Sequence, residues 1–124
     1  MRAKFGPAGN SDSFSKVHKS SLMAPKWIAE QGLDCYEYQC GKGVHIGEEA
    51  AVKLGQEAVK AGISLSLHAP YFINFANPDD EMAAKSYGYV LDTAKACKLM
   101  GGKRVVFPPA AQGKATRETA VELA

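Results

Sequence analysis

The chain has 124 residues, 46% of them hydrophobic, with 15 Lys and Arg against 13 Asp and Glu, which gives a formal net charge of +2. These are the proportions of an ordinary globular domain with one core, so we expect a single domain over residues 1–124. The net charge is close to zero, which excludes nucleic-acid binding driven by the overall charge of the chain. No apolar run approaches the ~18 residues of a membrane span.

The first third of the chain predicts one strand, a loop and one helix. Residues 2–5 form a short extended segment before a Gly-Pro turn, and the polar stretch 11–21 is typical of a loop. A helix should follow, with Ser20 or Ser21 as its N-cap and Pro25 in its first turn.

The middle of the chain has the clearest periodicity. Residues 33–39 predict a second strand, because two tyrosines alternate there with polar side chains. Residues 48–61 carry apolar side chains at helical spacing behind an acidic first turn, and Gly62 should end this helix. Residues 63–67 predict a third strand that runs straight into His68.

The last third repeats the alternation of helix and strand. A helix over 77–100 is predicted, with Asn77 as its N-cap and Pro78 at its first position. Residues 104–107 predict a fourth strand, which two prolines end abruptly. Thr116 should cap a last helix.

Four alternations of strand and helix indicate a parallel sheet with crossover helices. An open doubly wound sheet and a (β/α)₈ TIM barrel both fit this order. A full barrel needs about 250 residues, and this chain has half that length and half the strands. We therefore expect an α/β fold of the (β/α)₈ TIM-barrel family, here with about four β/α units, a half-barrel.

The cysteines indicate a reducing compartment. Cys35, Cys40 and Cys97 are odd in number and form no CxxC pair, so we expect free thiols in a cytoplasmic protein. The start of the chain has basic residues but no apolar stretch of a secretory leader, which agrees with this expectation. Cys97 falls on the apolar side of a predicted helix and should lie in the core.

Polar residues at strand ends are the candidates for chemistry, because parallel α/β folds bind ligands at the carboxyl edge of the sheet. His68 should lie at that edge, available to a metal or as an acid or base, unless a backbone carbonyl satisfies it. His18 and His45 are expected to be solvated loop residues. Lys103 and Arg104 should form a solvated pair at the opposite edge.

The segment LSLHAPYFIN, residues 65–74, resembles the endonuclease IV family of apurinic/apyrimidinic endonucleases, within the xylose isomerase-like barrels. In that family the third strand ends in a His, followed by two small or polar residues, a Tyr and a Leu-Asn or Ile-Asn pair. The opening RAKFGPAGN is similar to a shorter-loop branch of the family, and KRVVF is similar to its fourth strand. The likeness covers this whole chain and the N-terminal half of a family member.

The resemblance implies a barrel that binds three zinc ions and hydrolyses the DNA backbone on the 5′ side of abasic sites. It implies that His68 is a zinc ligand and that Tyr71 wedges into abasic duplex DNA at the lesion. Lys42 lies in the loop that carries another DNA-contacting side chain in the family, although the loop length differs. The resemblance assigns no catalytic residue to this chain.

One departure from the family changes the expected activity. The family places a second zinc-binding His after the fourth strand, where this chain has Pro108, which has no side-chain donor. A catalytic zinc normally takes three protein ligands, and His68 supplies one. We therefore expect that the chain alone is not a competent nuclease.

Two other functions stay open. A sugar isomerase or epimerase of the same superfamily would use fewer metals, and the loss of a His at Pro108 favours it. A non-catalytic half-barrel would leave sheet edges uncovered, and also an inner layer lined by residues such as Leu65, Leu67 or their neighbours. Such a chain should pair with a second copy as a homodimer, or with the missing C-terminal half-barrel.

Overall fold

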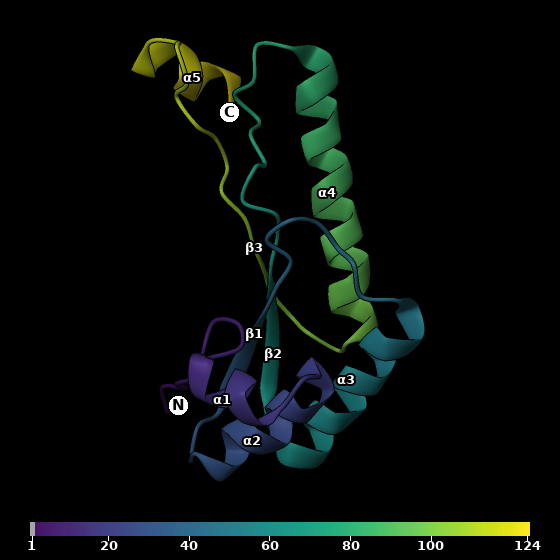
Figure 1. Ribbon diagram of the computed structural model, residues 1–124. Helices are drawn as coiled ribbons and strands as arrows, with labels where there is room; N and C mark the ends of the chain where they lie inside the picture. Colours follow the sequence, from purple (N-terminus) through teal and green to yellow (C-terminus); the bar gives the residue numbers. More distant parts are fainter. Residues whose placement is uncertain (1) are drawn as a thin grey trace.

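Three parallel strands form the sheet of the computed structural model, which describes residues 2–124. The strands are β1 (Cys35–Gln39), β2 (Ser64–His68) and β3 (Val105–Val106), and they lie in the order β1-β2-β3 (Figure 1). The predicted parallel sheet is confirmed. β3 is shorter than predicted, and Pro108 and Pro109, which cannot donate to a ladder, follow close behind it.

The N-terminal segment (residues 5–9) runs along the outer side of β1. The Glu37 amide donates to the Pro7 carbonyl (3.1 Å), and the Gly9 amide donates to the Glu37 carbonyl (2.9 Å). The strand predicted at 2–5 is therefore wrong in position, because the pairing lies further along the chain. Pro7 has no amide hydrogen, and this prevents a regular ladder at the segment.

The helices are α1 (Asp12–Val17), α2 (Ala24–Glu30), α3 (Glu48–Ala61), α4 (Asp80–Leu99) and α5 (Arg117–Leu123), with a 3₁₀ turn η1 (Ser21–Met23) before α2. The loop predicted over 11–21 is wrong in its first part. Ser11 Oγ accepts from the Phe14 amide (3.2 Å), and the buried Phe14 ring anchors α1 to the core. Ser20 is confirmed as a cap, because its Oγ accepts from the Leu22 amide (3.3 Å) at the start of η1.

Capping residues set where the later helices begin and end. α3 has the bounds that its pattern predicts, and Gly62 ends it with a φ of 70°, a conformation that glycine adopts without strain. α4 begins later than predicted because Asp79 is its N-cap, whereas Asn77 accepts from the Asp79 amide (3.0 Å) and shapes the preceding turn. Thr116 caps α5 as predicted. Within residues 2–124, no helix is long and apolar enough to cross a membrane.

Alternate residues of β2 face opposite layers. Leu65 and Leu67 belong to the core between the sheet and the helices, where Leu67 and Leu54 of α3 are fully buried. Of the residues expected to line the inner face of a half-barrel, the two leucines are therefore wrong, and their neighbours are the ones that line it. Because side chains alternate along a strand, the inner face carries Ser66 and His68 instead.

Burial of two weak acids predicts a loss of stability at alkaline pH. Burial raises the pKa of the Cys40 thiol to about 11 and that of the Tyr36 hydroxyl to about 12. In the unfolded chain these groups lose their protons near pH 9 and pH 10, so stability should be intact below pH 9 and should fall between pH 9 and pH 12. Each group contributes on the order of 2 to 3 kcal/mol. Urea unfolding at stepped pH measures this fall.

The Tyr36→Phe variant is the control for that pH dependence. It should lose the contribution of the Tyr36 hydroxyl, which falls between pH 10 and pH 12, and keep the contribution of Cys40, which falls between pH 9 and pH 11. An unfolding free energy that stays constant from pH 9 to pH 12 would contradict the burial of both groups.

Candidate functional site

Two loops meet at the carboxyl edge of the sheet (Figure 1). They are the loop after β1 (residues 40–47) and the first part of the loop after β2 (residues 69–75). The Tyr71 amide donates to the Gly41 carbonyl (3.3 Å) and joins them. We refer to these two loops together with His68, the last residue of β2, as the mouth.

His68 lies at the centre of this edge, between Gln39 of β1 and Val106 of β3. Its side chain is partly buried, and Nδ1 lies 2.9 Å from the Ala69 carbonyl oxygen. A protonated Nδ1 donates to this carbonyl and leaves the lone pair on Nε2. The His thus has the backbone partner that a structural role requires and a ring nitrogen that can accept a proton or bind a metal.

An exposed aromatic side chain, Tyr71, stands on the rim of the mouth. It is 68% exposed, and its ring packs edge-on against Phe72, with centroids 5.4 Å apart. Phe72 packs in turn against Tyr89 of α4, at 4.8 Å. Pro70 and Ile73 are buried and anchor the backbone on both sides of this pair. The loop therefore presents the Tyr71 ring to solvent from an anchored backbone.

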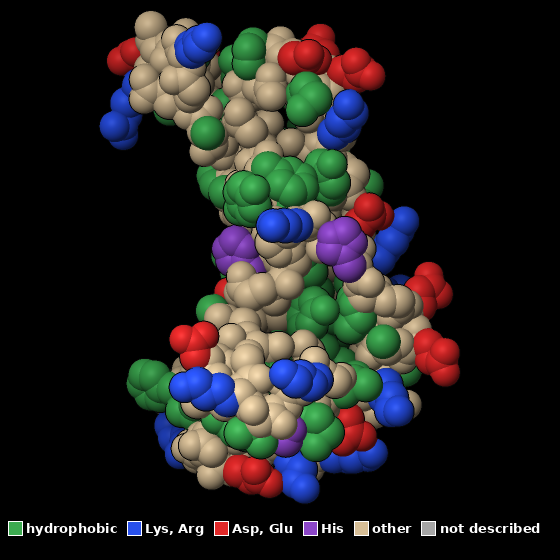
Figure 2. Space-filling model, viewed as in Figure 1, with side chains coloured by type: hydrophobic (Ala, Val, Ile, Leu, Met, Phe, Trp, Pro, Cys, Tyr) green, Lys and Arg blue, Asp and Glu red, His purple; other side chains and the backbone are tan. Residues whose placement is uncertain are grey.

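Lys42 lies in the tight turn of the loop after β1, which the Gly43 amide closes by donating to the Cys40 carbonyl (2.9 Å). Its exposed side chain takes part in none of the ion pairs found among residues 2–124. His45 is exposed, as predicted for a loop residue, and its Nε2 lies 3.2 Å from the Lys42 carbonyl oxygen. Figure 2 shows His side chains on either side of a basic side chain, below a band of hydrophobic side chains.

Asn74 fixes the loop after β2 in place, a role that the sequence did not indicate. Its Oδ1 accepts from the amides of Ala76 (3.1 Å) and Ala111 (3.0 Å). Its own amide donates to Ser86 Oγ of α4 (3.0 Å). Asn74 therefore ties the mouth to α4 and to the segment after β3. An Asn beyond a strand end, where its side chain can satisfy loop amides, is the signal that could have predicted this role.

The described residues do not fit a zinc site. Pro108 follows β3 at the position where the resemblance implies a second His, and a proline ring has no donor atom. Within the described range 2–124, no three His, Cys, Asp or Glu side chains are grouped so that they could hold a metal ion. His68 supplies one ligand of the three that a catalytic zinc needs, so this chain's residues alone do not position a metal-bound water.

Comparison with known proteins identifies the family. The model of the Xylose isomerase-like TIM barrel family matches residues 25–124, and the chain belongs to this family. No curated protein matches the chain. Among solved structures it is similar to the D-psicose 3-epimerase of Clostridium cellulolyticum H10 with D-tagatose (TM-score 0.71, 14% identity) and to a D-psicose 3-epimerase in the presence of D-fructose (TM-score 0.70, 12% identity).

The match to the epimerases is a match to part of a barrel. It covers 85% of this chain and 39% of each epimerase chain. The parallel strands and their crossover helices thus form part of a TIM barrel, and the predicted half-barrel fold is confirmed. At 12 to 14% identity the likeness concerns the fold alone.

Proposed function

We propose that the mouth recognises abasic sites in duplex DNA, as the resemblance to endonuclease IV implies. The observation that carries this proposal is the exposed Tyr71 ring, held on the rim of the same mouth as the Lys42 ammonium group, which has no ion-pair partner among residues 2–124. An abasic site leaves a gap in the base stack, and an aromatic side chain can fill such a gap by stacking on the neighbouring bases. The ammonium group would contact a phosphate, since phosphate contacts position a protein on duplex DNA.

The resemblance implies that His68 is a zinc ligand, but recognition of the lesion does not require a metal at this residue. Hydrolysis of the DNA backbone in this class of site requires a group of metal ions, and the described residues supply one recognisable ligand. We therefore assign recognition of the lesion to this chain and expect no nicking of abasic duplex above background. Chelator-sensitive cleavage of an abasic oligonucleotide by the purified chain would contradict this assignment.

The affinity of the chain for Zn²⁺ should accordingly be weak. Titration calorimetry should find no stoichiometric site of sub-micromolar affinity, because a single imidazole is far from a complete ligand set. The Pro108→His variant adds one imidazole and still falls short of three ligands, so it should not create a tight site. Tight stoichiometric binding by the unmodified chain that disappears in His68→Ala would show that the chain completes a zinc site by itself.

Fluorescence anisotropy with two labelled duplexes, one intact and one with a stable abasic analogue, tests the proposal. The chain should bind the abasic duplex more tightly. Tyr71→Ala should reduce affinity for the abasic duplex roughly tenfold and leave the intact duplex little changed, because only the lesion offers a stacking site. Lys42→Gln should reduce the affinity for both duplexes, and it should reduce the magnitude of the slope of log affinity against log salt by about 1.

Tyr87→Ala provides the matched control, since Tyr87 is 62% exposed but lies on α4 outside the mouth. It should change neither affinity. Equal affinity for the two duplexes, or an equal loss in the Tyr71 and Tyr87 variants, would contradict the proposal.

A sugar isomerase or epimerase site is the second candidate. Two observations favour it: the proline at position 108 and the fold similarity to D-psicose 3-epimerases. D-Fructose binding at the mouth, detected by calorimetry and abolished in Tyr71→Ala, together with equal affinity for the abasic and intact duplexes, would decide in favour of this candidate.

A further inference from the structure

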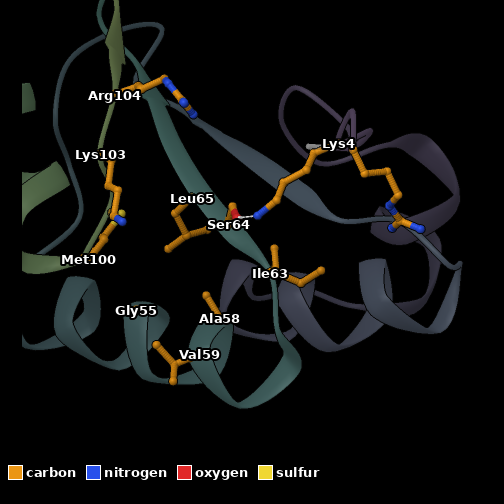
Figure 3. Close-up of a pocket in the computed structure, with 12 residues that line it drawn as sticks. Lys4, Gly55, Ala58, Val59, Ile63, Ser64, Leu65, Met100, Lys103 and Arg104 are labelled. Atoms are coloured by element: carbon orange, nitrogen blue, oxygen red, sulfur yellow. Dashed lines mark hydrogen bonds between the residues drawn. The ribbon is translucent and has the colours of Figure 1, made fainter.

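A cavity of about 610 Å³ lies at the amino edge of the sheet, opposite the mouth. It is formed between the starts of β2 and β3 and the last turns of α3 (Figure 3). Its volume is in the range of small-molecule sites, about 300 to 1,000 Å³. We refer to it as the basic pocket, because its charged lining residues are all cationic.

The cations of the basic pocket are Arg2, Lys4, Lys103 and Arg104. Arg2 is paired with Asp34, whereas the other three take part in no ion pair within the described chain. The Lys4 ammonium donates to Ser64 Oγ, a neutral partner, which directs it toward the start of β2 (Figure 3). Three positive charges therefore surround one cavity without a neutralising carboxylate, an arrangement that an anion would stabilise.

The floor of the basic pocket is apolar. Ala58 of α3 points toward Leu65 of β2 across it, and Val59 of α3 lines its solvent-facing side (Figure 3). Val59 is 81% exposed, so the floor is open to solvent. The floor can lie this close to the strand starts because Gly55 allows α3 to approach the chain at Met100: a Cβ on Gly55 would lie 2.5 Å from the Met100 carbonyl oxygen.

We propose that the basic pocket binds a small organic phosphate monoester. Its dianionic phosphate would sit among Lys4, Lys103 and Arg104, which offer ammonium donors and a guanidinium that can bind two phosphate oxygens at once. Its organic group would lie on Ala58 and Val59. A phosphate monoester fits better than a carboxylate, because three unpaired cations match a dianion with three terminal oxygens. The site lies apart from the mouth, so the proposal does not depend on DNA recognition.

Titration calorimetry of the full chain with phenyl phosphate tests the proposal, with inorganic phosphate and phenol as separate probes. Phenyl phosphate should bind at one site per chain, at least about tenfold more tightly than inorganic phosphate, and phenol should not bind. Lys103→Gln and Arg104→Gln should each reduce the affinity for phenyl phosphate about tenfold or more, because each variant loses one charge-assisted contact. Lys53→Gln, an exposed lysine of α3 outside the basic pocket, should leave its affinity unchanged.

Val59→Asn tests the apolar floor without a risk to the core, since Val59 is exposed. It should reduce the affinity for phenyl phosphate severalfold and leave the affinity for inorganic phosphate unchanged. Absence of phenyl phosphate binding, or an equal loss in the Lys53 variant, would overturn the proposal. Equal affinities for inorganic and phenyl phosphate would overturn the assignment to an organic phosphate.

Discussion

The Gly6→Ala variant should lose about 3 kcal/mol of unfolding free energy, the upper end of the usual cost of overpacking. A Cβ at this position would lie 1.7 Å from the Cys35 carbonyl oxygen and 2.5 Å from its carbonyl carbon. Both are backbone atoms of β1, so the N-terminal segment must move away from the strand. That movement breaks the pairing of Pro7 and Gly9 with Glu37. Urea unfolding followed by circular dichroism measures the loss.

Gly88→Ala is the matched control, with the opposite sign. Gly88 is exposed in α4, and nothing lies within 4 Å of the position that its Cβ would take. Ala there should stabilise the chain by about 0.5 to 1 kcal/mol, because it restricts the unfolded chain and favours the helix. Equal stability of the Gly6 and Gly88 variants would show that the N-terminal segment does not pack on β1.

The second large effect is an expected doubling of mass in solution. β3 is the edge strand of the sheet and presents unpaired backbone groups that can pair with another chain. Val106, on this edge, is 44% exposed. Two copies related by a two-fold axis would cover the β3 edge of each chain at once. Light scattering at micromolar concentration should therefore give twice the chain mass of 13.2 kDa.

Val106→Lys should convert this dimer to the single-chain mass, because a charge on an edge strand opposes pairing. Val121→Lys, at a residue of α5 that is 69% exposed, should leave the dimer intact. A stable, cooperatively unfolding species of single-chain mass in the unmodified protein would contradict self-association through the sheet.

The helices and strands predicted most accurately are those whose hydrophobic pattern and capping residues indicate the same bounds. α3 was predictable to the residue because an acidic first turn, apolar side chains at helical spacing and Gly62 all specify the same bounds. α1 was missed because its serines are typical of loops, and its stability comes from one ring, Phe14, that is buried only after the chain folds. Sequence periodicity over so few residues cannot indicate that contact.

The candidate site was predictable in outline only. The position of His68 follows from where a strand ends, and that prediction needs no tertiary information. The role of Asn74 depends on three partners from separate parts of the chain: the amides of Ala76 and Ala111, which donate to its side chain, and the Ser86 hydroxyl, which accepts from its amide. Lys103 and Arg104 are exposed at the opposite edge of the sheet, as predicted. The cavity that they line with residues of α3 was not predictable, because it depends on Gly55, which brings that helix close to the chain after α4.

Amide chemical shifts of the isotope-labelled chain, recorded on addition of a duplex with one abasic site, test most directly whether the mouth binds this lesion. The largest changes should fall on residues 40–45 and 68–75, and an intact duplex should produce much smaller changes there. Changes confined to the surroundings of Lys103 and Arg104, or equal changes with both duplexes, would contradict the proposed function.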